Sequence, residues 1–242
     1  MAFLKNLFGG KSTPNYPTDE LVVNGERLKL TFFAHASLAI EYMDKHIYVD
    51  PVMENAEYDK LPKADVILVT HSHYDHFDMA AIDHLIKGDT HILLDKTSAE
   101  GFVGDCYTML PGAVAEPFTD VKVEAVAAYN TSEHQLQFHP KEREDCGYVI
   151  TLGGAVRIYV SGDTEPTEEL RAVKNIDIAF ICCNQPYTMT PGQAVEAVKA
   201  IRPAIYYPYH YGQVDEPTDV EALAKMLEGE CDVRIRPLAY DI

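Results

Sequence analysis

The sequence predicts an α/β protein of the α+β type, built as a two-sheet sandwich with helices on its outer faces. Two observations carry this prediction. The chain divides into two similar halves, and in each half several strand-like runs come before strands and helices alternate. In both halves, side chains able to bind a metal follow directly after buried strands. We expect an N-terminal arm over residues 1–20 and a single domain over residues 21–242, because Lys11 to Asp19 has the composition of a linker.

The first half begins with three strand-like runs, and the turn Met43-Asp44-Lys45 suits a hairpin between the second and the third. A fourth, fully apolar strand over 66–69 leads to apolar residues at helical spacing, which predict a helix over 79–86. The other elements expected in this half are strands over 28–33, 37–42, 46–50 and 91–95, and a short helix over 97–104.

The second half repeats this order of elements. A Gly153-Gly154 turn predicts a hairpin. Thr190, Pro191 and Gln193 form the sequence pattern of a capping box at the start of a helix. The strands expected are 121–128, 147–152, 155–160, 177–182, 204–209 and 232–236, and further helices are expected over 165–173 and 216–228.

The composition excludes several classes of protein. The formal net charge of −18 and the pI of about 4.8 argue against a nucleic-acid partner, which needs a basic surface. No apolar run approaches the roughly 18 residues that a membrane helix needs, and residues 1–10 make a poor signal peptide. The five cysteines are odd in number and form no Cys-x-x-Cys, which favours a reducing, cytoplasmic location.

The strongest functional signal is the loop that follows the strand over 66–69. Three imidazoles and a carboxylate lie within six residues: His71, His73, Asp75 and His76. His71 and His73 are two residues apart in extended chain, so both rings can face one ion. Asp75 and His76 follow the turn and can reach a second ion or a bound water. Neutral imidazole and carboxylate suit zinc or a similar divalent metal.

The pattern His-x-His-x-Asp-His after a strand resembles the signature of the metallo-β-lactamase superfamily. The resemblance extends over roughly Leu28 to Gly212. It implies a four-layer αββα sandwich with one or two metals at one edge, and usually a hydrolase.

Two shorter segments resemble the branch of that superfamily with ascorbate-phosphate lactonases and N-acyl-phosphatidylethanolamine phospholipases. They are the turn 34–37, with Ala34 where that branch has glycine, and Asp50-Pro51. The resemblance makes Asp50 an acceptor for the N–H of a ligand imidazole. It also makes His35 a candidate substrate contact.

The first ion needs one more nitrogen, and we expect the polar loop 129–140 to supply it. Many relatives have a histidine where Asn130 stands, so this chain departs from the commonest family pattern. His139 and His134 both remain open for the role. We favour His139, because its Phe-His-Pro context resembles a less characterised branch. Asn130 is then a candidate contact for a metal-bound water or the substrate.

Two later strands also end in candidate ligands. From the residues alone, Asp163 suits a helix N-cap; the resemblance makes it the carboxylate that bridges two metals. His210 resembles the closing histidine of the family, which binds the second metal. Tyr187, in a loop, is a candidate wall of the substrate pocket.

The implied ligands form two sets that share one carboxylate. The first set is His71, His73, His139 and Asp163; the second is Asp75, His76, Asp163 and His210. Two ions held in this way can activate one water, and Asp75 can instead orient that water or protonate the leaving group. Zinc is the expected metal, and manganese, nickel and iron accept the same ligands.

The predicted function is metal-dependent hydrolysis of an ester-type bond, a lactone or a phosphoester or phosphodiester, in a small-molecule substrate. Two alternatives remain open: an iron-dependent redox member of the same superfamily, and a non-catalytic metal-binding protein. No segment resembles an attached flavin-binding or rhodanese module. The sequence leaves the oligomeric state open.

Overall fold

Two mixed β-sheets form the middle of the molecule in the computed structural model, which describes residues 14–212 and 217–238. The first sheet contains β1 (Thr18–Val23), β2 (Glu26–Phe32), β3 (Leu38–Tyr42), β4 (Lys45–Val49), β5 (Val66–Val69), β6 (His91–Asp95) and β7 (Tyr107–Met109). The second contains β8 (Val114–Phe118), β9 (Val121–Ala127), β10 (Cys146–Leu152), β11 (Val156–Val160), β12 (Ile178–Cys182), β13 (Ile205–Tyr209) and β14 (Asp232–Val233).

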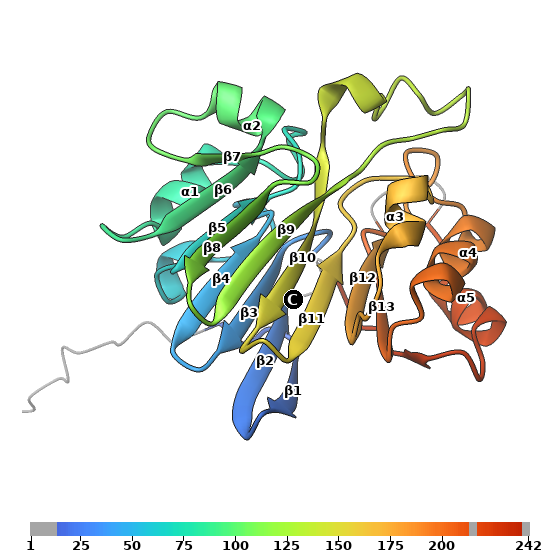
Figure 1. Cartoon of the computed structure of the whole chain (residues 1–242), viewed down its shortest axis with the longest axis horizontal. Coiled ribbons are helices and arrows are strands. Elements are labelled where there is room, and N and C mark those ends of the chain that lie inside the picture. Colours follow the sequence, from blue (N-terminus) through green and yellow to red (C-terminus); the bar gives the residue numbers. More distant parts are fainter. Residues whose placement is uncertain (1–13, 213–216, 239–242) are drawn as a thin grey trace, which may run out of the picture.

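The helices are short and cover the outer faces of the sheets. They are α1 (Met79–Leu85), α2 (Lys96–Gly101), α3 (Glu168–Ala172), α4 (Pro191–Ile201) and α5 (Val220–Met226), with 3-10 turns at Tyr58–Lys60 and Lys141–Arg143. Figure 1 shows α1 and α2 on one side of the molecule and α3, α4 and α5 on the other. The predicted capping box at the start of α4 is present, with Thr190 and Gln193 bonded reciprocally. No helix in the described ranges is long and apolar enough to cross a membrane.

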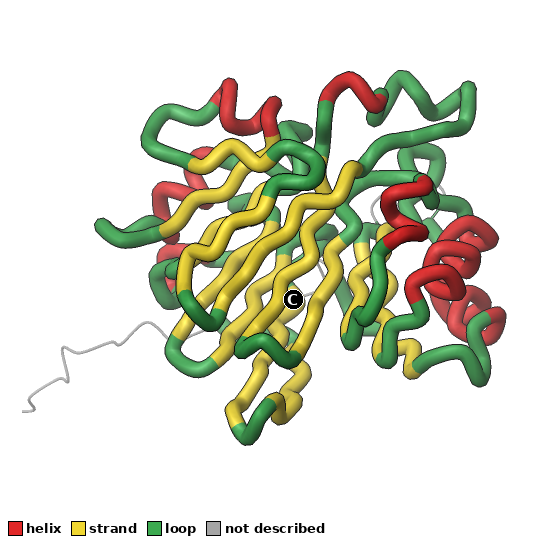
Figure 2. The backbone as a smooth tube through the Cα atoms, in the orientation of Figure 1, coloured by secondary structure: helices red, strands yellow, loops and turns green. Residues whose placement is uncertain are grey.

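Each sheet combines antiparallel and parallel pairing in the same order. Strands β1 to β4 pair antiparallel, and β4 to β7 pair parallel. Likewise, β8 to β11 pair antiparallel and β11 to β14 parallel. Figure 2 shows that the strands fill the centre and the loops gather at their ends. Parallel strands end at the same edge, so residues that follow them are brought together there.

The core has two parts, which explains why β5 is apolar at every position. Val66 and Leu68 belong to the core between the two sheets, whereas Ile67 and Val69 pack toward α1 in a separate cluster. A strand buried on both faces has no polar side to present. The arrangement of helix, sheet, sheet and helix confirms the predicted four-layer fold.

Several element boundaries differ from the sequence predictions. Strand β1 begins at Thr18, so the last three residues of the range expected as an arm belong to the sheet, and residues 1–13 lie outside the described residues. Strands β7 and β8 were not predicted, because most of their residues are exposed or half-buried and give no apolar alternation. Strand β14 is shorter than expected, and α5 begins at Val220 rather than at residue 216, which lies outside the described residues.

Candidate metal centre

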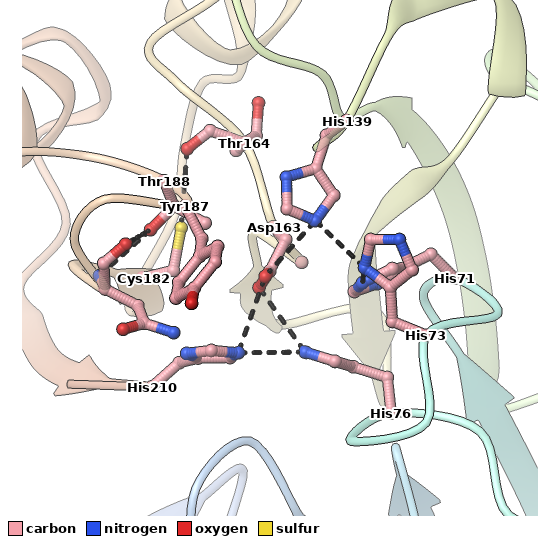
Figure 3. A network of polar contacts seen from close by, with 12 residues as sticks. His71, His73, His76, His139, Asp163, Thr164, Cys182, Tyr187, Thr188 and His210 are labelled. Atoms are coloured by element: carbon pink, nitrogen blue, oxygen red, sulfur yellow. Dashed lines mark hydrogen bonds and ion pairs between the residues drawn. The ribbon is translucent and has the colours of Figure 1, made fainter. Parts of the chain in front are cut away.

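Seven candidate ligands converge at the edge where β5, β11 and β13 end. Four come from the loop after β5, one from the loop between β9 and β10, and one each from the residues after β11 and β13. They are His71, His73, Asp75, His76, His139, Asp163 and His210. Figure 3 shows the five imidazoles around the carboxylate of Asp163.

The first cluster of nitrogens is formed by His71, His73 and His139. The Nε2 of His71 lies 3.0 Å from Nδ1 of His73, and Nε2 of His139 lies 3.2 Å from the same nitrogen. An oxygen of Asp163 lies 3.5 Å from Nε2 of His139. This is the first ligand set that the sequence predicted. The ligand atoms of the three histidines lie within 4.8 Å of one another, close enough to hold a single metal ion.

The second cluster lies on the other side of Asp163. The Nε2 atoms of His76 and His210 are 3.0 Å apart, and Oδ2 of Asp75 lies 3.5 Å from the latter. The two oxygens of Asp163 lie 3.5 Å from His76 Nε2 and 3.4 Å from His210 Nε2. The carboxylate of Asp163 therefore stands between the two clusters, where one group could contact two ions.

His35 belongs to this second cluster. Its Nε2 lies 2.9 Å from Oδ2 of Asp75, and its ring centroid is 3.9 Å from that of His210. The sequence predicted a substrate contact for His35. The structure places it beside a candidate ligand, close enough for His35, Asp75, His76 and His210 to hold one ion.

Asp50 orients the His76 imidazole from behind. The side chain of Asp50 is fully buried, and it accepts hydrogen bonds from Thr70 N at 2.7 Å and Thr70 Oγ1 at 2.8 Å. It also lies 2.8 Å from His76 Nδ1. An ionised carboxylate only accepts hydrogen bonds, so a proton is assigned to Nδ1, and Nε2 is the nitrogen that faces the cluster. This contact is the one that the sequence predicted for Asp50.

The buried environment keeps the first cluster uncharged. Burial lowers the pKa of His71 well below its usual value, and the neighbouring imidazoles of His76 and His139 lower it further. Burial also lowers the pKa of His73 to about 4 and that of His139 to about 3. Neutral imidazole is the form that binds metals.

The pKa values of the two carboxylates at the centre are shifted in opposite directions. Burial raises the pKa of Asp163 to about 7, although the His76 imidazole opposes this shift. For Asp75, burial also favours the protonated form, but hydrogen bonds from His210 and His35 outweigh it and hold the pKa well below its usual value. Burial disfavours charge on His76, yet Asp163 and Asp50 raise its pKa to about 10.

The donor set fits a divalent cation. The Oδ1 atom of Asp163 is buried and has no hydrogen-bond partner in the described structure. Ring nitrogens lie 3.0–3.2 Å apart in both clusters, and a neutral imidazole has one nitrogen lone pair available for a metal. A cation between them would satisfy these atoms, which are the ligand types that zinc prefers.

Gly162 is required for the position of Asp163. Its backbone has φ of +61°, and a Cβ there would lie 2.9 Å from the carbonyl oxygen of Cys146 and 3.1 Å from Cβ of Thr70. The turn after β11 therefore passes directly against the first sheet. A hydrogen bond from Cys146 N to Thr70 O at 3.0 Å also joins the second sheet to the histidine loop. Together these contacts bring Asp163 of the second half against the histidine loop of the first.

Asn130 holds the loop that carries His139. Its side-chain Nδ2 donates to the carbonyl oxygen of Tyr187 at 2.7 Å and lies 3.3 Å from Nδ1 of His139. Its backbone N–H donates to His139 O at 2.8 Å. The sequence predicted that Asn130 contacts a metal-bound water or substrate. The structure instead places its side chain within the loop, behind the imidazole.

Glu165 is a buried residue beside the site that no sequence pattern indicated. Its buried carboxylate accepts hydrogen bonds from the backbone N–H groups of Thr131 and Ser132, both at 2.6 Å, and from Nε2 of Gln193 at 2.6 Å. Burial opposes its ionisation, but the hydrogen bonds, chiefly from Ser132, lower the pKa of Glu165 to about 2. Glu165 thus joins three segments: the His139 loop, the Asp163 turn and the start of α4. The available signal was its position, two residues after Asp163.

The two remaining predicted residues, His134 and Tyr187, lie outside the clusters of candidate ligands. His134, the alternative to His139, is exposed and belongs to neither cluster. Tyr187 is 39% exposed at the mouth of the site, where its ring packs edge-on against Phe138 with centroids 4.9 Å apart.

A cavity of about 770 Å³ opens onto both clusters. Candidate ligands and His35 line its inner part, and Tyr187 forms part of the wall as predicted from the sequence. Other lining residues were not identified as site residues from the sequence, because they are not themselves part of a ligand pattern. They are Val52, Glu54, Asn55, Asp78, Phe138 and Asn184.

Comparison with known proteins assigns this fold and cluster to a family. The model of the beta-lactamase superfamily domain matches residues 29–210, so the chain belongs to that superfamily. A relative from Thermoplasma acidophilum, named UPF0173 metal-dependent hydrolase, is 32% identical over 217 residues, covering 82% of this chain and 92% of that protein. This chain is accordingly a metal-dependent hydrolase of the metallo-β-lactamase superfamily, as the sequence predicted.

Solved structures agree with this assignment. A crystal structure from Parabacteroides distasonis, provisionally described as a metal-dependent hydrolase, is 41% identical with a TM-score of 0.86, and the match covers 92% of this chain and 99% of that one. Igni18, described as a novel metallo hydrolase from Ignicoccus hospitalis, has a TM-score of 0.70 and covers 88% of this chain and 96% of its own. At 21% identity, the second likeness shows the fold alone.

Proposed function

We propose that this protein hydrolyses an ester-type bond, a lactone or a phosphoester, in a small-molecule substrate at a mono- or dinuclear centre of divalent metal, with zinc as the expected ion. The observation that carries the proposal is the position of Asp163 between two clusters of imidazole nitrogens, at the inner end of an open cavity. Such a centre is suited to activating water close to a bound substrate.

The residues assigned to the metals follow from the two clusters. His71, His73, His139 and Asp163 would hold one ion; Asp75, His76, His210 and Asp163 would hold the other. When bound, the metal lowers the pKa of a water molecule toward 7 and polarises the scissile bond.

Asp75 is the residue we assign to proton transfer. It lines the cavity, and its pKa is held well below the usual range by hydrogen bonds from His210 and His35, so it is ionised at neutral pH. An ionised carboxylate at this place orients the attacking water by accepting a hydrogen bond from it. It can take that proton as the water attacks and return it to the oxygen of the leaving group. His35 keeps the carboxylate in place through the contact of 2.9 Å.

The test is hydrolysis by the full-length protein after loading with Zn²⁺ or Mn²⁺. Turnover of δ-valerolactone or of bis(p-nitrophenyl) phosphate by the wild-type protein, lost in the Asp75→Asn variant, supports the proposal. Bound zinc or manganese with no turnover on a broad panel of esters favours the non-catalytic alternative. Iron in the protein as isolated, again without turnover, favours the redox alternative. The five cysteines are unpaired, and cytoplasmic location remains a prediction that fractionation of the source cells would test.

A further inference from the structure

The cavity above the metal centre carries no positive side chain. Among the described residues that line it there is no lysine or arginine, whereas Glu54, Asp75, Asp78 and Asp163 contribute carboxylates. The carboxylate of Asp78 already accepts hydrogen bonds from the backbone N–H groups of Met53 and Ala80, whereas Glu54 is exposed. Proteins that recognise phosphate esters usually supply guanidinium or ammonium groups.

Arg143 lies near the histidine loop, but its guanidinium group is bonded to residues outside the cavity. Its Nε donates to Asp145 at 2.8 Å and its NH2 group to Ser72 Oγ at 3.3 Å, and it is absent from the cavity wall. A substrate with a negative charge beyond the scissile bond would therefore meet carboxylates and no compensating side chain. The wall favours an uncharged substrate.

Asn184 is a polar group in this cavity with no partner of its own. It follows β12, lines the cavity and is 3% exposed. Its backbone is fixed by a tight turn, in which Asn184 N donates to Thr188 Oγ1 at 2.9 Å and Thr188 N donates to Asn184 O at 2.7 Å. Its side-chain Oδ1 is buried without a hydrogen bond. The side-chain Nδ2 likewise has no hydrogen bond to another described residue, so it can donate to a molecule in the cavity. Buried amides in native proteins are almost always bonded, so this amide indicates a ligand.

The geometry points to an uncharged carboxylic ester or lactone as the substrate class, with the Asn184 amide donating to its carbonyl oxygen. This inference rests on the proposed function and names the substrate for that same site. An amide N–H suits a neutral carbonyl oxygen, and it strengthens its hydrogen bond as negative charge develops there. The edge-on pair of Phe138 and Tyr187, with Val52 on the wall, offers apolar surface for the substituents of the ester.

In this reaction the oxygen of water bonds to the carbonyl carbon, and the electron pair of the C=O bond moves onto the carbonyl oxygen beside Asn184. The C=O bond then re-forms and the C–O bond to the leaving group breaks. One proton of the water goes to the leaving oxygen by way of Asp75, giving an alcohol. The carboxylic acid that remains releases the other proton to solvent as it ionises.

The test compares wild type, Asn184→Ala and Asn184→Asp as metal-loaded full-length proteins, with Asn15→Ala as a control at an exposed position. The substrates are p-nitrophenyl butyrate, δ-valerolactone and bis(p-nitrophenyl) phosphate. We expect Asn184→Ala to lower kcat on the two uncharged esters by about 10²–10³-fold, the usual effect of removing one such donor. Metal content should match that of wild type, because the metal ligands are unaffected, and kcat on the phosphodiester should fall less than kcat on the two uncharged esters.

A binding measurement separates the substrate class from the activity itself. δ-Valerolactam, an uncharged carbonyl compound that resists hydrolysis, should bind wild type more tightly than Asn184→Ala in calorimetry, whereas inorganic phosphate should bind both equally. Equal lactam binding by the two proteins, or preferred turnover of the phosphodiester by wild type, would overturn this inference and leave the hydrolase proposal standing. Absence of turnover on all three substrates would overturn the proposed function, and the lactam titration would still decide what Asn184 binds.

Discussion

The two halves of the molecule repeat one order of strand pairing, yet they supply the metal centre in different ways. The first half contributes four candidate ligands from a single loop of six residues after β5, between His71 and His76. The second half contributes three, each from a different segment: His139 from a long loop, Asp163 after β11 and His210 after β13.

The difference determines how each half is supported. The first loop begins at a fully buried strand and is held by Asp50, which bonds Thr70 and His76. The ligands of the second half depend on contacts between segments far apart in sequence, through Asn130 and Glu165. We therefore expect the metal centre to be sensitive to changes at distant positions in the second half, and mainly to changes of the ligands themselves in the first.

The largest effect is expected from the double substitution His71→Ala and His73→Ala in the first half. It removes two of the three nitrogens of one cluster, so one equivalent of metal should be lost. Activity should fall by more than the roughly 10–100-fold that loss of an outer partner costs. Elemental analysis of the purified variant measures this, with circular dichroism as the check on folding. Unchanged metal content would show that the cluster is not a metal site.

The next largest effect is expected from the loss of a single ligand in the second half. His139→Ala should weaken metal binding at the first cluster, because Nε2 of His139 lies 3.2 Å from Nδ1 of His73. His134→Ala serves as the matched control, since His134 is exposed on the same loop. Metal affinity measured by competition with a chelator should fall only in the first variant. A greater loss in His134→Ala would reverse the assignment.

A change away from any ligand tests whether the second half needs its supporting contacts. Glu165→Gln replaces an acceptor of several hydrogen bonds by a group that cannot accept them all. We expect metal affinity to fall about 10–100-fold, as for other outer partners of metal ligands. Glu169→Gln is the control, because Glu169 contacts Tyr129 and Lys141 on the outer side of the same loop. Equal effects of the two variants on chelator competition would mean that Glu165 has no special role.

The smallest effect on the metal centre is expected at Asp19, in the first half and remote from the cluster. Burial opposes its ionisation, but hydrogen bonds from Tyr207 and Arg236 lower the pKa of Asp19 below its usual value. A lowered pKa stabilises the fold fully above the ordinary value near 4, and this contribution is lost as the pH falls through the lowered pKa. Asp19→Asn should cost about 1–3 kcal/mol at pH 7, with a smaller difference from wild type below pH about 4.

Urea unfolding of wild type and Asp19→Asn at several pH values measures this contribution. Asp232→Asn provides the control, because Asp232 is an exposed partner of Arg234. Metal content should be the same in all three proteins. A difference between wild type and Asp19→Asn that grows as the pH falls would contradict the account.

The same contrast explains what the sequence could predict. The His71 to His76 loop was recognised because all its ligands are adjacent, and Val66 to Val69 because a strand buried on both faces is apolar throughout. Asp163 and His210 follow buried strands and were found through their family resemblance. Glu165, Asn184 and Glu54 gave no such signal, because they lie in the separate loops after β11, β12 and β4, and only the packing of these loops brings them to the site. Asp19 was assigned to an arm, since its partners Arg234 and Arg236 lie more than two hundred residues later.

The most direct test of the shared centre is anomalous diffraction from a crystal of the zinc-loaded protein. We expect two zinc peaks roughly 3.5–4 Å apart, the separation typical of two-metal sites. One should lie beside His71, His73 and His139 and the other beside His76 and His210, with Asp163 between them. A single peak remote from Asp163, or two peaks that do not share its carboxylate, would contradict the claim that the two halves build one centre.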